Sequence, residues 1–167
     1  MGKRRLIGKI VILMLGLAAV VILAANSDTI PVSTPKKGYR VVIDPGHGGS
    51  DCGAVGVSGV KEAGLNLAVS LYLKEELEAL GMESILTRSD ERALAEGKKA
   101  DMAARGKIMN GEGVDLVVSV HMNKFTDPSV HGPMAFYMKG SAEGEKLAKT
   151  VIDSITDELG APRRIAN

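Results

Sequence analysis

The sequence predicts an α/β fold of three layers, in which a mixed, largely parallel sheet is flanked by helices. From Tyr39 onward, short apolar segments typical of strands alternate with segments of helical periodicity, as in βαβ units. Two of the strand candidates run directly into a histidine, at His47 and at His121. With 167 residues, 45% of them hydrophobic, the chain has the composition of one globular domain.

The composition excludes several classes of function. The net charge is +1, aromatic residues make up 3% and tryptophan is absent, so neither a basic surface nor a stacking platform for nucleic acid is expected. The single cysteine, Cys52, excludes a disulfide framework and a multi-cysteine zinc site. Any metal ion must therefore be held by histidine and carboxylate ligands.

The N-terminal region has the pattern of an export signal. Four basic residues precede the apolar run of residues 10–25, as in the n-region and h-region of a leader. Residues 1–25 are expected to be either a cleaved signal peptide or a signal-anchor that stays in the membrane. Residues 26–38, which contain two prolines, are expected to form a linker. The domain that follows, residues 39–167, would then lie outside the cytoplasm.

The first strand of the domain is expected at Val41-Val42-Ile43, where three apolar β-formers occur together. Pro45 cannot donate to a ladder and ends the strand, which leaves His47 on a glycine-rich turn. A helix is expected to open at Glu62 and to end before Gly81. Its apolar positions, which predict the face packed on the sheet, are Leu65, Val69, Tyr72, Leu73, Leu77 and Leu80.

The next strand is expected at Met82 to Leu86, followed by a helix from about Lys98 to Asn110. Within that helix, Asp101 and Arg105 have the spacing of an ion pair. Residues 115–120 form a third apolar strand that leads into the second histidine.

The last elements are a strand at residues 134–138 and a helix capped by Ser141. The apolar positions of this helix are Leu147, Val151, Ile152, Ile155 and Leu159. Gly160 and Pro162 end it, and only five residues follow, where a helix on a parallel sheet normally leads to another strand. We therefore expect a fold that is truncated at its C-terminus.

Three side chains are expected to converge at one edge of the sheet. His47 and His121 each follow a strand, and Glu62 opens the helix after the glycine-rich loop, so parallel strands would place all three at the carboxyl edge, where α/β sheets bind ligands. Two imidazoles and one carboxylate form the ligand set of a catalytic zinc site, which activates water at neutral pH. The nitrogen ligands argue against calcium and magnesium.

Other roles are open for several residues. Glu62 could simply favour the helix dipole, and Asn66, one turn on, could orient Glu62, touch substrate or face solvent. His131 is expected to be structural, and Arg88 to pair with a nearby acid. Cys52 could be a thiol nucleophile with a histidine, or only a small buried hydrophobe.

These residues resemble the zinc-dependent N-acetylmuramoyl-L-alanine amidases of the Amidase_3 type. The resemblance covers the chain from about Tyr39 to its last residue. Within the family, the N-terminal segment and residues 90–99 and 142–149 are most similar to the germination-specific amidases of spore-forming bacteria. The matching motifs are Val41-Val42-Ile43-Asp44-Pro45-Gly46-His47-Gly48-Gly49, Gly59-Val60-Lys61-Glu62, Asn66-Leu67, Leu86-Thr87-Arg88, Ser119-Val120-His121-Met122-Asn123, Gly132 and Phe136-Tyr137.

The resemblance implies that His47, Glu62 and His121 bind Zn²⁺. It also implies that the substrate is peptidoglycan, hydrolysed at the amide between N-acetylmuramic acid and L-alanine. Asn66 and Asn123 are the expected substrate contacts, and the sequence does not reveal whether the protein has a protein partner.

The family's general-base glutamate lies on a later strand, and this chain ends before that motif. The catalytic base is therefore unknown, with Asp44 and Asp51 the only stand-ins near the histidine turn. We expect a partial form with little activity. The alternative is a non-catalytic peptidoglycan-binding or regulatory module that keeps the metal pocket.

Overall fold

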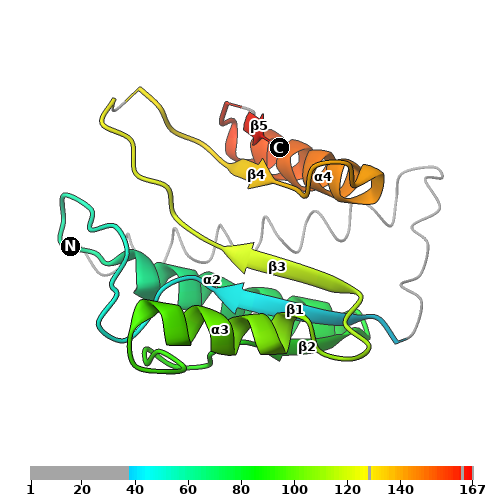
Figure 1. Ribbon diagram of the computed structural model, residues 1–167. Coiled ribbons are helices and arrows are strands. Elements are labelled where there is room, and N and C mark those ends of the chain that lie inside the picture. The colour runs from blue at the N-terminus through cyan, green and yellow to red at the C-terminus, as the bar shows by residue number, and fades with distance from the viewer. Residues whose placement is uncertain (1–37, 128, 163, 167) are drawn as a thin grey trace.

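The computed structural model describes residues 38–127, 129–162 and 164–166. The expected leader and nearly all of the linker lie outside these residues. The main sheet has three parallel strands in the order β2-β1-β3: β1 (Arg40–Pro45), β2 (Glu83–Leu86) and β3 (Leu116–Val120) (Figure 1). The strands expected from the sequence are thus confirmed, with ends that shift by one or two residues.

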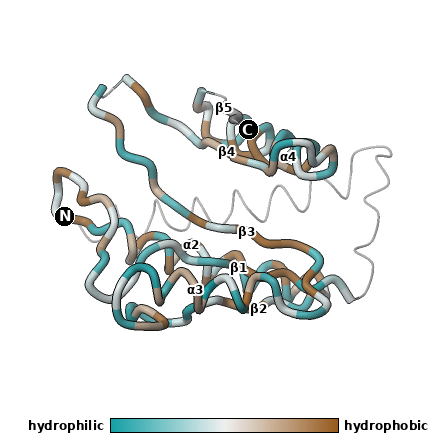
Figure 2. Tube along the Cα trace, viewed as in Figure 1, coloured by the Kyte–Doolittle hydropathy of each residue, from teal (hydrophilic) through white to brown (hydrophobic). Residues whose placement is uncertain are grey.

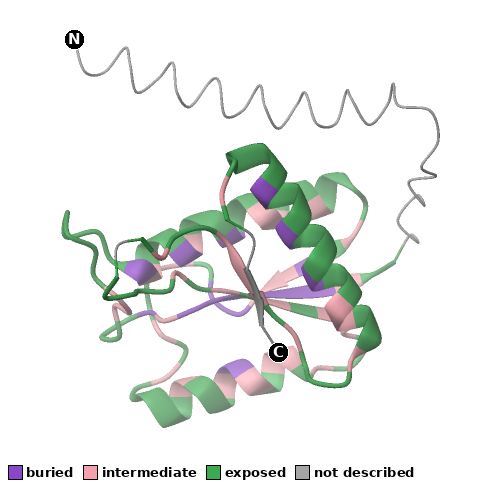
Figure 3. Ribbon diagram, turned by 90° about the horizontal axis from the view of Figure 1, so that it is seen from above, coloured by how far each residue is buried: buried purple, intermediate pink, exposed green. Residues whose placement is uncertain are grey.

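Helices cover both faces of the strands. Figure 3 shows α3 (Lys98–Met109) and α2 (Glu62–Ala79) on opposite sides of the sheet, whereas α4 (Ala142–Leu159) packs on the strands near the C-terminus. This arrangement confirms the expected α/β class with a largely parallel sheet between helices. No helix of the described residues combines the length and the apolar character needed to cross a membrane.

The central strand β1 forms the core of the sheet. Val41, Val42 and Ile43 are buried, because β1 is paired on both sides and packed by helices on both faces. Strand β3 is also apolar in sequence, as Figure 2 shows. It pairs only with β1 among the described strands, however, and its residues alternate between half-buried and exposed.

Helix α2 turns a different face to the sheet from the one that its apolar residues predicted. Its buried residues are Glu62, Asn66 and Ser70, each one turn after the last. Of the predicted apolar face, Leu73 and Leu77 are half-buried. The exposed positions are Leu65, Val69, Tyr72 and Leu80. The helix is oriented by the polar side chains at its start, which reach the edge of the sheet.

The C-terminal elements form a second, smaller unit. Strand β4 (Met134–Phe136) pairs in parallel with β5 (Arg164–Ala166), and α4 contacts both. Strand β5 lies within the five residues that follow Pro162, where the sequence predicted no particular element. Ser141 caps α4 by accepting a hydrogen bond from Gly144 N at 3.0 Å, as expected. The apolar positions predicted for α4 are exposed, apart from Ile152, which packs inward between Ala148 and Thr156.

Candidate metal centre

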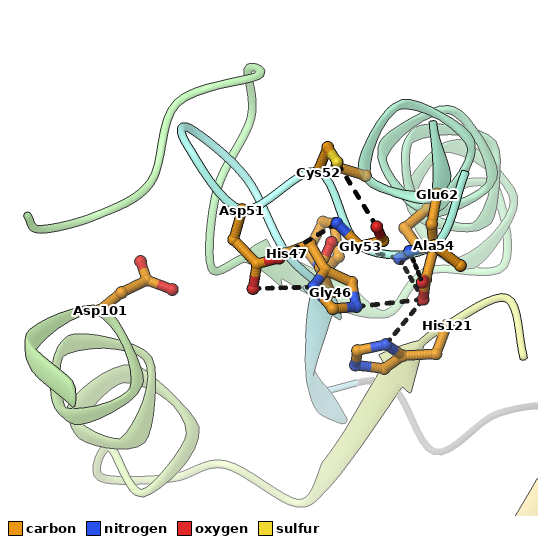
Figure 4. A network of polar contacts seen from close by, with 12 residues as sticks. Gly46, His47, Asp51, Cys52, Gly53, Ala54, Glu62, Asp101 and His121 are labelled. Atoms are coloured by element: carbon orange, nitrogen blue, oxygen red, sulfur yellow. Dashed lines mark hydrogen bonds and ion pairs between the residues drawn. The ribbon is translucent and has the colours of Figure 1, made fainter. Parts of the chain in front are cut away.

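The register of the sheet brings the two histidines together. Pro45 at the end of β1 is the neighbour of Val120 at the end of β3, so the residues that follow both strands leave the same edge. His47, Glu62 and His121 each offer a ligand atom, and these atoms all lie within 4.8 Å of one another (Figure 4). The predicted convergence is therefore found in the structure.

Glu62 lies at the middle of this group. Its Oε1 is 3.2 Å from His47 Nε2 and 3.0 Å from His121 Nδ1, while Oε2 accepts a hydrogen bond from Ala54 N at 2.8 Å. Burial alone would raise the pKa of Glu62, but hydrogen bonds from the backbone N–H groups of Ala54 and Met122, and from side chains, lower this pKa to about 2. The carboxylate is therefore ionised at every physiological pH.

Two glycines make room for the histidine rings. A Cβ atom on Gly46 would lie 2.2 Å from His121 Cε1, and a Cβ on Gly53 would lie 2.6 Å from Glu62 Oε2 and 2.7 Å from His47 Cδ2. The two imidazole rings meet edge to face, with centroids 5.0 Å apart. The glycine-rich sequence around His47 is thus required by close packing as well as by turn geometry.

The turn that carries His47 is strained and is held by a buried arginine. His47 has φ 63°, and among the described residues it is the only one other than glycine with positive φ. Arg105, with 1% of its surface exposed, donates from Nη2 to His47 O at 2.6 Å and from Nη1 to Pro45 O at 2.7 Å. Its charge is balanced by Asp44 at 2.8 Å and by Asp101 at 2.7 Å. The expected Asp101–Arg105 pair is confirmed, but its main role is to fix the histidine turn.

Arg88 holds the same turn from another direction. It donates to Pro45 O at 2.9 Å, to Gly46 O at 2.8 Å and to Ala63 O at 2.9 Å. Burial, and the positive charge of Arg105, lower the pKa of Arg88. The expected ion pair with a nearby acid is not found among the described residues. A buried guanidinium here binds main-chain carbonyls instead.

Asp44 is part of this buried network and is not placed to act as a base. It accepts hydrogen bonds from Thr87 at 2.6 Å, Arg105 at 2.8 Å and Ser119 at 3.0 Å. Burial alone would raise the pKa of Asp44, but these three hydrogen bonds lower it. Asp51, the other candidate for a catalytic base, is already in contact with His47, because its Oδ2 lies 2.9 Å from Nδ1 of the ring.

The donor set fits a metal ion. Both ring nitrogens of His47 face a carboxylate: Nδ1 is 2.9 Å from Asp51 Oδ2, and Nε2 is 3.2 Å from Glu62 Oε1. A neutral imidazole has only one proton, so it can donate to one of these carboxylates and leaves a lone pair facing the other. A cation beside that lone pair and the carboxylate would relieve their repulsion. Nitrogen and oxygen donors of this kind suit zinc.

A cavity of about 420 Å³ opens beside the two histidines. It lies between the histidine turn, the ends of β1 and β3, and α3. Its lining includes three carboxylates, Asp44, Asp51 and Asp101, and each of them is already hydrogen-bonded to a neighbouring side chain. The cavity therefore offers space for a substrate but no free carboxylate from these three residues.

The remaining candidates differ in their access to this site. Asn66, with no exposed surface, donates to Gly46 O at 3.2 Å and to Glu62 Oε1 at 3.3 Å, so it is placed to orient Glu62. Asn123 is exposed, two residues beyond His121. Cys52 Sγ donates to Gly53 O at 3.4 Å, and no hydrogen bond joins it to a histidine in the described part of the chain.

His131 lies apart from this group. It is exposed, and its Nδ1 is 2.9 Å from Ser129 O in the loop before β4. It is not part of the group that His47, Glu62 and His121 form.

Comparisons with known proteins point to one family. The family model for Amidase_3, N-acetylmuramoyl-L-alanine amidase, matches residues 41–167. The germination-specific N-acetylmuramoyl-L-alanine amidase of Bacillus subtilis is 34% identical over 142 residues, which cover 80% of this chain and 60% of that protein. The amidase AmiA of Escherichia coli is 32% identical over 126 residues, which cover 75% of this chain and 42% of AmiA.

A solved structure shows the same fold. The CwlD amidase from Clostridioides difficile, determined in complex with the GerS lipoprotein, superposes with a TM-score of 0.70 at 27% identity. The match covers 76% of this chain and 71% of the CwlD chain. In the sequence comparisons, this chain spans only about 40–60% of the length of the B. subtilis and E. coli relatives. The family model covers most of the chain, and the chain therefore belongs to the Amidase_3 family of N-acetylmuramoyl-L-alanine amidases.

Proposed function

We propose that this protein is a zinc-dependent amidase of the cell wall. It would hydrolyse the amide between N-acetylmuramic acid and L-alanine in peptidoglycan. The observation that carries the proposal is the convergence of two imidazoles and an ionised carboxylate within 4.8 Å. That convergence occurs in a chain of the amidase family, beside a cavity at the carboxyl edge of the sheet.

His47, Glu62 and His121 would hold the zinc ion. Zinc bound there would supply a Lewis acid for the amide carbonyl. Glu62 contributes a fixed negative charge, because its pKa of about 2 keeps it ionised. Arg88 and Arg105 hold the histidine turn in place.

Asn123 stands at the exposed side of the site, where its amide could bind the peptide of the substrate. Its Nδ2 currently donates to Met134 Sδ at 3.7 Å, a weak bond that a substrate carbonyl could replace. We propose Asn123 as a substrate contact, and Asn66 as the residue that orients Glu62.

Proton transfer is the weak point of this chemistry. The leaving amine must gain a proton, and Asp44, Asp51 and Asp101 are committed to other partners. We expect the 167-residue chain to hydrolyse its substrate slowly, since a positioned general base contributes typically about 10²–10⁴-fold. The same observation favours a second candidate function, a peptidoglycan-binding module that keeps the metal pocket but does no chemistry.

We propose the following setting for this domain. Residues 1–25 would direct export, as a cleaved leader or as a membrane anchor. Residues 26–38 would connect this segment to the domain of residues 39–167, which contains the metal centre. The likeness to a germination-specific amidase supports a role in remodelling the wall of spores. The CwlD relative was solved with a lipoprotein, which supports a protein partner here as well.

The test is hydrolysis of purified muropeptides by the full chain, with and without added zinc. The released stem peptide would be measured by mass spectrometry. We expect slow release that depends on zinc, that stops on chelation and that is lost in His47→Ala. His131→Ala is the matched control, because His131 is a histidine outside the site, and it should leave the rate unchanged.

Three results separate the candidates. Zinc-dependent release supports the amidase. Zinc binding with no release, even after long incubation, contradicts it and supports the binding module. If the chain binds no zinc, the metal centre that both candidate functions assume is wrong.

A further inference from the structure

The two imidazoles of the proposed metal centre are held in different ways, and Asp51 is the cause. Asp51 Oδ2 lies 2.9 Å from His47 Nδ1, and its Oδ1 accepts a hydrogen bond from Gly53 N at 3.1 Å. The carboxylate therefore joins the outer nitrogen of the ring to the backbone of the loop that returns to Glu62 (Figure 4). We propose that Asp51 is a positioning residue, which fixes the tautomer and the orientation of His47 so that Nε2 faces the metal position.

The backbone around Asp51 is fixed independently of its side chain. Gly48 N donates to Asp51 O at 2.8 Å, and Asp51 N donates to Gly48 O at 3.1 Å. This reciprocal pair closes the loop and places the carboxylate beside the ring. Asp51 is also exposed, so its removal leaves no buried charge or cavity. A substitution at Asp51 should therefore change the ring without unfolding the chain.

The contact selects one of the two neutral forms of His47. Each ring nitrogen faces a carboxylate, and the contact of Nδ1 with Asp51, at 2.9 Å, is the shorter of the two. With the proton on Nδ1 the lone pair is on Nε2. Nε2 is the atom that lies 3.2 Å from Glu62 Oε1. Without Asp51, the proton of the ring could move to Nε2 and donate to Glu62, which would block the ligand position. Carboxylates that contact a ligating histidine in this way raise its basicity and are worth about 10–100-fold in metal affinity.

His121 lacks such a partner among the described residues. Its Nδ1 is the atom that faces Glu62, at 3.0 Å, and no hydrogen bond to its Nε2 is found in the described part of the chain. Its side chain is 48% exposed, whereas that of His47 is 20% exposed. Asp51 therefore contacts only one of the two histidines, and the orientation of the His47 ring is fixed before a metal ion binds.

The inference rests on the proposed metal centre and can fail separately from it. The full chain is compared with Asp51→Ala, Asp51→Asn and a control, Asp127→Ala. Asp127 is matched because its exposed carboxylate also accepts a backbone N–H two residues ahead, Ser129 N at 2.9 Å, as Asp51 does with Gly53. Zinc affinity is measured by competition with a chromophoric chelator. The protonation of each ring nitrogen is read in the metal-free chain from long-range hydrogen–nitrogen NMR correlations.

We expect Asp51→Ala to bind zinc about 10–100-fold more weakly. The His47 ring should lose its exclusive protonation at Nδ1. Asp51→Asn should recover part of the affinity, because the amide oxygen can still accept from Nδ1–H, and Asp127→Ala should match the unaltered chain.

Two results would overturn the inference. One is equal zinc affinity in Asp51→Ala and the unaltered chain, and the other is a His47 ring that stays protonated at Nδ1 without the carboxylate. If the unaltered chain binds no zinc, the proposed metal centre fails first and this inference fails with it.

Discussion

The end of β1 and the end of β3 carry equivalent histidines, yet the protein holds these two segments very differently. The carbonyls of Pro45, Gly46 and His47 all accept hydrogen bonds from buried arginines. After β3, the corresponding contacts of the described residues are a hydrogen bond from Gly46 N to Val120 O at 3.0 Å and the contacts with Glu62. The turn that carries His47 is held by buried arginines, whereas the segment that carries His121 is held by its contacts with Gly46 and Glu62.

This difference follows from the positions of the two strands. Strand β1 is central and paired on both sides, so the turn after it is enclosed by α2, α3 and the loop before α3. Strand β3 is at the edge of the three-stranded sheet. A metal site built from one enclosed and one exposed ligand can be assembled in part before the metal arrives. The difference between the enclosed His47 and the exposed His121 can be tested by substitution and by pH.

Removal of the Arg105 side chain should give the largest effect. Arg105→Ala would leave the buried carboxylate of Asp44 without its cation and would free His47 O, at a cost of about 3–5 kcal/mol in the free energy of unfolding. Urea denaturation measures this loss. Arg92→Ala is the matched control, since the Arg92–Asp90 pair is exposed to solvent and should contribute little to stability. Similar losses in both variants would contradict a special role for the histidine turn.

Acid should release the second histidine by protonating Glu62. The pKa of Glu62 is lowered in the folded chain to about 2 from 4.5, so its contribution to stability is complete above pH 4.5 and is lost as the pH falls toward 2. The shift corresponds to roughly 3 kcal/mol. Unfolding free energies of the metal-free chain and of Glu62→Gln, compared from pH 6 to pH 2, should converge on acidification by that amount. Parallel curves would show that Glu62 does not hold the site in this way.

Much of this site could be predicted because its residues lie at the ends of elements with strong local patterns. An apolar run ended by Pro45, a second run ended by His121 and a helix start at Glu62 define three ends. Parallel pairing then brings them to one edge without further information. The separation of the ligands along the sequence, from residue 47 to residue 121, hides the site only from a search for local motifs.

The residues that support the site were harder to predict, because the sequence does not show whether a charged side chain is buried or exposed. Arg105 has the spacing of a surface ion pair with Asp101, and nothing local shows that its guanidinium reaches the turn at His47. The face of α2 was mispredicted for a related reason. Apolar periodicity marks a candidate face, but the helix is rotated by the contacts that Glu62 and Asn66 make at the sheet edge. Strand β5 has three residues, too few for a pattern.

The smallest expected effect tests the placement of His121 by packing alone. In Gly46→Ala the new Cβ would overlap the His121 ring, at 2.2 Å from Cε1, so the ring must leave the position in which it contacts Glu62. Such overpacking costs about 1–3 kcal/mol. Zinc affinity should fall at least about tenfold, because one ligand is displaced while the arginines still hold His47 through Pro45 and His47 carbonyls. Chelator competition and urea denaturation measure the two quantities.

Gly64→Ala provides the control for this substitution. Gly64 lies inside α2 with nothing within 4 Å of an added Cβ, so alanine there should stabilise the helix by about 0.5–1 kcal/mol and leave zinc affinity unchanged. If Gly46→Ala binds zinc as tightly as Gly64→Ala does, then His121 can adjust without loss. The exposed histidine would in that case be a ligand that the metal itself positions, and only the His47 half of the site would be set by the fold.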